Sequence, residues 1–286
     1  MHIGPLRISR RSIAVVVAAA GVLSLAIGAH AALNMRALDA AKAKAVATDQ
    51  DAGVTRHASR LALVIGNGHY PDAGTPLTQP INDARALSAA LRHDGFDVDM
   101  VEDATRDDMS RAVARLKARI TPGSVVMLFF GGYGVQAGLE SYMLPVDSVI
   151  WKESDVRREG VSIESVLDAM KEKGARAKLV VIDASRRNPY ERRFRSFSHG
   201  LAPVYAPDNA LILSSAAPGQ VVYDSKGKDS ALVAELLHNL SGQTGVEEAF
   251  KKTRAAVSRV SDGQQVPSVS SSLAEDVRLG SGENGG

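Results

Sequence analysis

Two predicted strands end in residues that could do chemistry. The apolar run at residues 124–130 is followed by Gly-Gly-Tyr-Gly at 131–134, and the run at 178–182 is followed by Asp-Ala-Ser-Arg at 183–186. A serine hydroxyl attacks a carbonyl carbon only when a base accepts its proton. A tyrosine hydroxyl, with an ordinary pKa of about 10, is protonated at neutral pH and is a poor base. The chain has no cysteine, which excludes thiol nucleophiles, disulfides and thiolate metal sites.

The elements that position these residues alternate between strand and helix. Apolar runs predict strands at 61–65, 96–101, 124–130, 178–182 and 210–213. Helical spacing predicts helices at 82–93, 105–119, 162–173, 229–240 and 246–260, with Thr105 as an N-terminal cap and Ser162 and Ser165 as candidate caps. This alternation predicts an α/β fold, a three-layer α/β/α sandwich with a mostly parallel central sheet. Functional groups of such sheets collect just beyond the carboxyl ends of the strands, where Tyr133 and Ser185 stand.

Length and charge favour one globular domain without a nucleic-acid partner. The chain has 286 residues, enough for a domain of roughly 200–250 residues with its own core. The first 33 residues contain Arg7, Arg10 and Arg11 and no acidic residue; without these three, 31 basic side chains face 32 acidic ones. A nucleic-acid-binding surface needs a concentrated basic face, so we expect no nucleic-acid partner.

The N-terminus predicts export. The three arginines precede an uncharged apolar run at 13–27, and Ala29-His-Ala31 then offers a small-x-small cleavage site. Residues 1–33 are therefore predicted to be a signal peptide or an N-terminal membrane anchor. Either outcome places the remainder outside the cytoplasm, in the periplasm or tethered to the inner membrane. We expect a linker at 34–59, a folded domain at 60–279 and a disordered tail at 280–286.

Seven short motifs occur in a characteristic order. They are Leu-Val-Ile-Gly-Asn at 63–67, Pro-Ile-Asn-Asp-Ala-Arg at 80–85, Phe-Phe-Gly-Gly-Tyr-Gly at 129–134, Tyr-Met-Leu-Pro-Val-Asp at 142–147, Val-Ile-Asp-Ala-Ser-Arg-Arg-Asn-Pro-Tyr at 181–190, Ala-Pro-Gly-Gln at 217–220 and Gln-Val-Pro at 265–267. Together they resemble the bacterial metacaspase-like branch of the caspase clan across residues 60–279. The resemblance implies a caspase-like fold.

The resemblance also implies that the peptidase chemistry is changed. Relatives in that branch carry a histidine base and a cysteine nucleophile at the positions of Tyr133 and Ser185. Because both groups are replaced, we expect a catalytically inactive pseudo-peptidase that acts in peptide or protein binding, scaffolding or regulation. The alternative is a serine-type hydrolase or endopeptidase that cleaves after Arg or Lys, with Ser185 as nucleophile and His69 or His199 as substitute base.

Two acidic residues match a specificity pocket of the same branch. Asp83 and Asp183 are implied to accept an Arg or Lys side chain of a ligand. The alternative is structural: Asp83 caps its own helix, and Asp183 accepts hydrogen bonds from loop amides.

The loop after Ser185 is rich in arginine, and no cofactor or metal site is indicated. Arg186, Arg187, Arg192, Arg193 and Arg195 predict a solvated surface loop, with an acidic partner or a lipid head group as the alternative. The spacing of His and carboxylate residues indicates no metal site, and nothing in the sequence calls for a cofactor.

Overall fold

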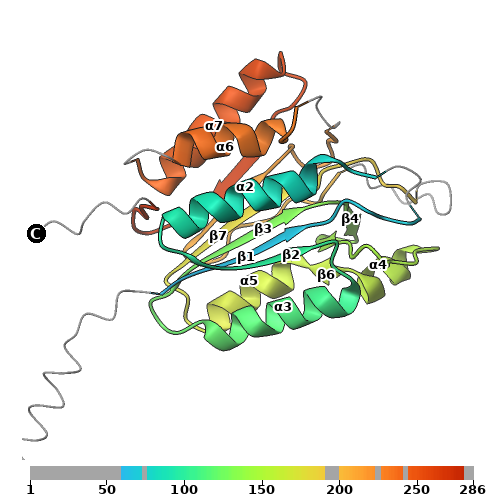
Figure 1. Ribbon diagram of the computed structural model, residues 1–286, viewed down its shortest axis with the longest axis horizontal. Coiled ribbons are helices and arrows are strands. Elements are labelled where there is room, and N and C mark those ends of the chain that lie inside the picture. Colours follow the sequence, from blue (N-terminus) through green and yellow to red (C-terminus); the bar gives the residue numbers. More distant parts are fainter. Residues whose placement is uncertain (1–58, 73–75, 191–199, 223–226, 241–243, 280–286) are drawn as a thin grey trace, which may run out of the picture. The chain divides into compact units, whose positions relative to one another are not determined.

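The computed structural model describes residues 59–72, 76–190, 200–222, 227–240 and 244–279 (Figure 1). The predicted signal peptide or anchor at 1–33, the linker apart from Ser59, and the tail at 280–286 lie outside these residues. Within the described part, no helix is long and apolar enough to cross a membrane.

A six-stranded sheet forms the centre of the domain, with its strands in the order β2-β1-β3-β7-β8-β9. These strands are β1 (Arg60–Gly66), β2 (Asp97–Glu102), β3 (Val125–Gly131), β7 (Ala177–Asp183), β8 (Ala210–Ser214) and β9 (Ser268–Ser271). The first five run parallel, and β9 pairs antiparallel with β8 at one edge. The predicted mostly parallel sheet is therefore confirmed.

Helices cover both faces of this sheet (Figure 1). One face carries α2 (Gln79–His93), α6 (Ala231–Leu240) and α7 (Val246–Val260), and the other carries α3 (Arg106–Arg119) and α5 (Ile163–Glu172). Alternate residues of each strand point to opposite faces, so Val64 belongs to the core under α2 while Leu63 and Ile65 belong to the core under α3. The three-layer sandwich is confirmed.

Local signals set most helix ends. Thr105 caps α3 in a reciprocal capping box with Asp108, and the Ser162 hydroxyl accepts the N–H of Ser165 at the start of α5. Helix α2 begins three residues before its predicted start, because Pro80 lies in the first turn, where its missing N–H costs no hydrogen bond.

A second, smaller sheet lies beyond the carboxyl end of β3. It contains β4 (Gly134–Ala137), β5 (Glu140–Met143) and β6 (Val161–Ser162), and the short helix α4 (Glu153–Glu159) lies beside it. These elements and β9 were not predicted. The β4–β5 hairpin turns at Gly138, whose φ of 66° is readily adopted by glycine, and a Gly-containing two-residue turn is the signal that would have revealed it.

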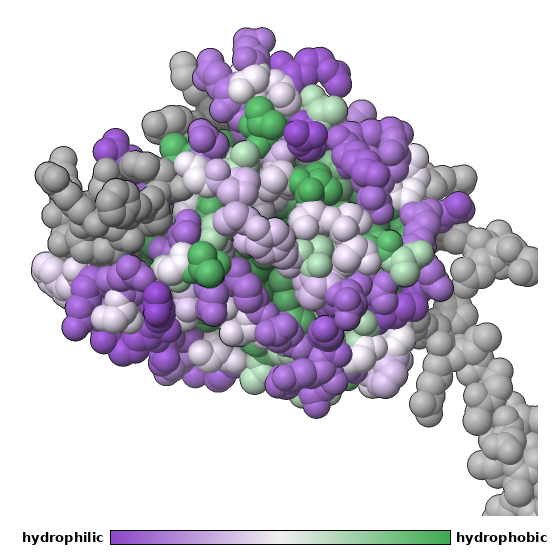
Figure 2. Space-filling model, turned by 180° about the vertical axis from the view of Figure 1, so that it is seen from behind, coloured by the Kyte–Doolittle hydropathy of each residue, from purple (hydrophilic) through white to green (hydrophobic). Residues whose placement is uncertain are grey.

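The small sheet covers a separate apolar cluster rich in tyrosine. Its buried residues are Tyr70, Leu77, Tyr133, Val135, Ala137, Tyr142, Leu144, Ile150, Val156 and Tyr190. On the face seen in Figure 2, by contrast, hydrophobic residues form small groups scattered among hydrophilic ones. The tyrosine-rich cluster is thus interior to the domain, at the end of the main sheet where the sequence places its site.

Candidate functional site

The carboxyl ends of β3 and β7 are neighbours. Gly131 is paired with Asp183 in parallel register. Beyond the strands, the Gly132 N–H donates to the Asp183 carbonyl oxygen (3.2 Å), and the Gly134 N–H donates to the Ala184 carbonyl oxygen (3.0 Å). The fold therefore brings together the two loops that carry Tyr133 and Ser185.

Ser185 is enclosed. It exposes 1% of its surface. Its N–H donates to Ser215 Oγ (3.4 Å), and its carbonyl oxygen accepts the N–H of Val222 (2.7 Å). A nucleophile must approach a carbonyl carbon to about 3–3.5 Å, so a peptide bond has no access to Ser185 in this structure.

The loop that continues from Ser185 helps to close this half of the site. Tyr190 exposes 1% of its surface, and its hydroxyl donates to the Ser148 carbonyl oxygen (3.3 Å). The side chain of Asn188 accepts the Tyr190 N–H (2.9 Å), which stabilises the turn of the chain. Tyr190 therefore packs into the tyrosine-rich cluster.

Tyr133 is held against a second tyrosine. Its ring meets the ring of Tyr70 edge to face, with centroids 4.9 Å apart and planes at 70°. The Tyr133 N–H donates to Tyr70 Oη (3.1 Å), and that hydroxyl donates to the Leu144 carbonyl oxygen (2.9 Å). A Cβ atom on Gly132 would lie 2.5 Å from Tyr70 Oη, so only glycine allows this close packing.

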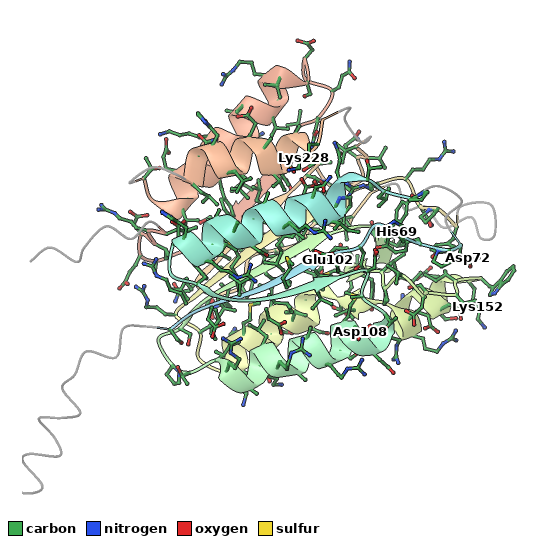
Figure 3. All side chains as sticks on the ribbon, viewed as in Figure 1. His69, Asp72, Glu102, Asp108, Lys152 and Lys228 are labelled. Atoms are coloured by element: carbon green, nitrogen blue, oxygen red, sulfur yellow. The ribbon has the colours of Figure 1, made fainter. Side chains whose placement is uncertain are left out.

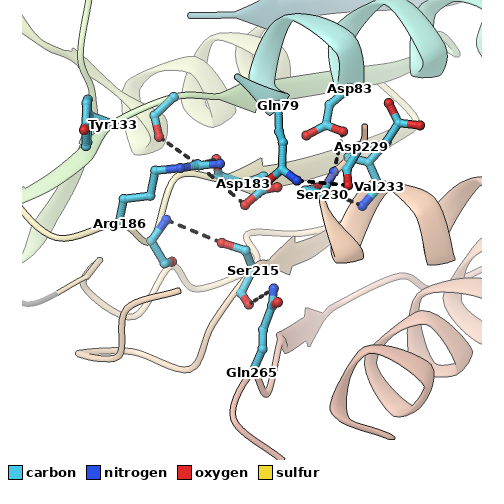
Figure 4. A network of polar contacts seen from close by, with 12 residues as sticks. Gln79, Asp83, Tyr133, Asp183, Arg186, Ser215, Asp229, Ser230, Val233 and Gln265 are labelled. Atoms are coloured by element: carbon cyan, nitrogen blue, oxygen red, sulfur yellow. Dashed lines mark hydrogen bonds and ion pairs between the residues drawn. The ribbon is translucent and has the colours of Figure 1, made fainter. Parts of the chain in front are cut away.

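Asp83 and Asp183 form the other half of the site (Figure 4). Both are buried, with 0% and 2% exposure. Asp83 Oδ1 accepts the N–H of Ser230 (2.8 Å) at the start of α6. Among the described residues, neither Asp83 Oδ2 nor Asp183 Oδ2 has a hydrogen-bond partner. Buried carboxylate oxygens without donors are costly.

Burial and repulsion from Asp183 change the protonation of Asp83. Burial, and then the negative charge of Asp183, raises the pKa of Asp83 from 3.8 to about 8. The hydrogen bond from Ser230 and the charge of Arg186 act in the opposite direction but are weaker. Asp83 is therefore mostly protonated at neutral pH when the site is empty.

The structural alternative for Asp83 is wrong in its detail. Helix α2 is preceded by Thr78 and has no side-chain cap, whereas Asp83 lies in its second turn and binds the first residue before α6. The neighbouring Gln79 side chain donates to the carbonyl oxygens of Gly227 (3.0 Å) and Asp229 (3.2 Å). The N-terminal part of α2 thus anchors the segment that leads into α6.

Arg186 does not lie in a solvated loop as predicted. It exposes 5% of its surface, while Arg187 beside it is exposed. Its guanidinium Nη1 donates to the carbonyl oxygens of Gly132 (3.0 Å) and Asp183, and lies 3.7 Å from Asp183 Oδ1 (Figure 4). The prediction fails because these inward-facing carbonyl oxygens need a donor. Arg192, Arg193 and Arg195 lie outside the described residues.

His69 lies at the same end of the sheet but at the surface (Figure 3). Its side chain is 67% exposed, and Nδ1 lies 2.5 Å from Asp103 Oδ2. Burial acts to raise the pKa of Asp103, but hydrogen bonds from the N–H groups of His69 and Gly68 and from the imidazole lower it overall. The other substitute base proposed from the sequence, His199, lies outside the described residues.

The described residues contain no group of three or more His, Cys, Asp or Glu side chains that could hold a metal ion. The site is therefore best described by its tyrosines, its hydroxyl and its two carboxylates.

Comparison with known proteins identifies the family. A family model described as the caspase domain matches residues 59–278. The chain belongs to the caspase domain family. Two curated proteins are also similar to this caspase domain: mucosa-associated lymphoid tissue lymphoma translocation protein 1 of Homo sapiens and its homologue in Mus musculus, each 29% identical over 134 residues. These residues are 46% of this chain and 16% of each relative, so the caspase domain described here matches only a small part of those proteins.

The sequence alone did not identify three residues of the site in this caspase domain. Tyr70 and Tyr190 fill the space around Tyr133, and Ser230 binds Asp83. Tyr190 belongs to the recognised motif at 181–190 and could have been singled out as an aromatic residue in an otherwise polar loop. Ser230 carried no such signal, because it is 147 residues away from Asp83 in the chain.

Proposed function

We propose that this caspase-family protein is a non-catalytic binding protein whose two buried carboxylates accept a basic side chain of a peptide or protein. The observation that carries the proposal is the pair of buried oxygens, Asp83 Oδ2 and Asp183 Oδ2, which find no donor among the described residues. A guanidinium or ammonium group supplies the N–H donors and the positive charge that this pair lacks.

The state of the nucleophile position supports a role in binding without catalysis. The chain contains no thiol, Ser185 exposes 1% of its surface, and Tyr133 packs against Tyr70. Nucleophile and base act as a unit in hydrolysis, so replacing both removes most of the rate.

Titration with a matched pair of peptides tests the proposal. A labelled peptide with one arginine is compared with the same peptide carrying citrulline, which has nearly the same shape but no charge, by fluorescence anisotropy on the full chain. We expect the arginine peptide to bind at least about ten-fold more tightly, and Asp83→Asn or Asp183→Asn to remove that preference. Asp208→Asn is the control, because that side chain is 84% exposed. Equal binding of both peptides, or an unchanged preference in the two variants, rejects the proposal.

A serine-type hydrolase that cleaves after Arg or Lys is the second candidate. One observation favours it: the His69 imidazole is held by Asp103, as a general base is held by a carboxylate in a catalytic triad. A fluorophosphonate probe that labels the chain, with labelling lost in both Ser185→Ala and His69→Ala, would support this candidate over the first.

A double substitution tests whether a reactive cleft exists. In Tyr133→His combined with Ser185→Cys, the groups expected of active relatives are restored. Because Ser185 is enclosed, we expect no cleavage of arginine or lysine peptide substrates by this variant. Cleavage there would show that the nucleophile position opens in solution.

We also propose that the domain functions outside the cytoplasm. The proposal rests on the arginines and apolar run of residues 1–33. In a bacterial host, protease added to spheroplasts should digest the domain, and a version starting at Asn34 should remain protected. Protection of the full chain would reject export.

A further inference from the structure

A long contact joins Nη1 of the buried Arg186 to the carboxylate of Asp183. A charge-assisted N–H···O bond to a carboxylate spans about 2.7–2.9 Å, whereas Arg186 Nη1 lies 3.7 Å from Asp183 Oδ1. The same nitrogen makes closer contacts with the backbone carbonyl oxygens of Gly132 and Asp183. Hydrogen bonds from Nη1 to the backbone thus hold this nitrogen next to the acidic pair.

The charge balance between Asp83, Asp183 and Arg186 depends on the protonation of Asp83. Below its pKa of about 8, Asp83 is mostly neutral, and Asp183 and Arg186 carry opposite charges. Above that pKa, two carboxylates face the guanidinium, and these three groups together carry one excess negative charge. A ligand cation that enters while Arg186 stays in place must approach a like charge in a poorly solvated site, where repulsion is strong.

We infer that Arg186 is an internal competitor of basic ligands: its guanidinium occupies the border of the acidic pair and must move outward for tight binding. The inference rests on the proposed function and adds its regulation. Without a ligand, the hydrogen bonds to the Gly132 and Asp183 carbonyl oxygens keep the Arg186 guanidinium at this border. A ligand therefore binds weakly unless it brings enough additional contacts to displace this side chain.

A substitution that removes the charge but keeps a donor tests the inference. In Arg186→Gln the amide can still donate to the Gly132 or Asp183 carbonyl oxygen. At pH 9, we expect this variant to bind the arginine peptide about ten-fold more tightly than the unmodified chain, which corresponds to about 1.4 kcal/mol. Arg187→Gln, at the exposed neighbouring position, is the control and should leave the affinity unchanged. Thermal unfolding of each variant verifies that it is folded.

A second measurement uses the unmodified chain and does not depend on the folding of any variant. Phenylglyoxal modifies accessible guanidinium groups, and mass spectrometry measures the modification at Arg186 relative to Arg187. With a saturating lysine peptide, which the reagent spares at the side chain, we expect modification of Arg186 to increase several-fold.

The outcomes separate the inference from the proposed function. If the unmodified chain prefers the arginine peptide, but Arg186→Gln binds no more tightly and the modification of Arg186 does not rise, the inference is wrong and the proposed function stands. If neither the unmodified chain nor folded Arg186→Gln prefers arginine over citrulline, the proposed function itself fails. Tight binding by Arg186→Gln alone supports both.

Discussion

The two halves of the strand-end site differ sharply in chemistry. Around Tyr133 and Ser185, tyrosine rings and backbone hydrogen bonds fill the space and enclose the hydroxyl. Around Asp83 and Asp183, the site remains charged, and two carboxylate oxygens find no donor among the described residues. Both halves lie at the carboxyl end of the central parallel strands.

The two halves are expected to contribute to the stability of the fold in opposite directions. A closed and fully packed half contributes stability, because buried rings and satisfied hydrogen bonds favour the folded state. A buried carboxylate pair costs stability, because charge is removed from water and like charges repel each other. A costly feature at a strand end is typical of a binding site, which supports the proposal that the acidic half binds a ligand.

The largest expected effect is in the closed half, with Tyr190→Ala. Removing a fully buried aromatic ring should lower the free energy of unfolding by about 3–5 kcal/mol, measured by urea denaturation. Tyr205→Ala is the control, since Tyr205 is 81% exposed, and it should change stability by less than about 0.5 kcal/mol. Similar small losses in both variants would mean that the loop after Ser185 is not packed as described.

Tyr70→Phe should have the next largest effect. The change leaves the Tyr133 N–H without its acceptor and the Leu144 carbonyl oxygen without the hydroxyl donor, at a cost of about 1–3 kcal/mol. Tyr142→Phe is a matched control, because its hydroxyl donates to the exposed Glu140, and it should cost less than about 1 kcal/mol. If the two variants unfold at the same urea concentration, the hydroxyl of Tyr70 does not hold the closed half together.

In the acidic half, the contribution of Asp83 to the free energy of unfolding should depend on pH. The pKa of Asp83 is 3.8 when unfolded and about 8 when folded, so the folded state holds a proton that the unfolded state has lost between these values. The stabilising effect of this proton is complete below about pH 4 and decreases by up to about 1.4 kcal/mol per pH unit as the pH rises to about 8. Burial is the main cause of this raised pKa, the charge of Asp183 adds to it, and the charge of Arg186 opposes it.

Urea denaturation at pH 5 and pH 7.5 checks this expectation. The difference between the unmodified chain and Asp83→Asn isolates the contribution of Asp83, because all other groups titrate in both proteins. Asp83→Asn should gain stability relative to the unmodified chain as the pH rises. If the difference in the free energy of unfolding does not vary with pH, Asp83 is ionised at both pH values. Its pKa would then not be raised by burial in the acidic half.

The smallest effect is expected at His69. Its pair with Asp103 lies at the surface, where ion pairs contribute less than about 1 kcal/mol. His69→Ala should therefore unfold at nearly the same urea concentration as the unmodified chain, and it should bind the arginine peptide unchanged. A clear loss of affinity would extend the binding half of the site to the loop after β1.

The sequence predicted the main elements because their signals are local. Apolar runs and helical spacing placed the parallel strands and the principal helices, and the caps at Thr105 and Ser162 are as expected. The small sheet and β9 escaped prediction because their strands have four residues or fewer and contain no continuous apolar run. The alternation of strand and helix was sufficient to place Tyr133 and Ser185 at one edge of the sheet.

The accessibility and charge of the site could not be predicted in this way. Arg186 is adjacent to another arginine in the chain and suggested a surface loop, yet backbone carbonyl oxygens of two neighbouring strand ends draw it inward. The partner of Asp83 comes from Ser230, and the ring that meets Tyr133 comes from the loop after β1. Each of these contacts joins segments that no local pattern relates.

The sequence by itself determined that thiol catalysis is absent, since the chain has no cysteine, and it determined which residues stand at the strand ends. The tertiary structure alone decided that Ser185 is enclosed while the carboxylates of Asp83 and Asp183 keep oxygens without donors among the described residues. The reason is physical: residue types and periodicity act over one or two turns of chain, whereas burial and electrostatics depend on every segment that packs nearby.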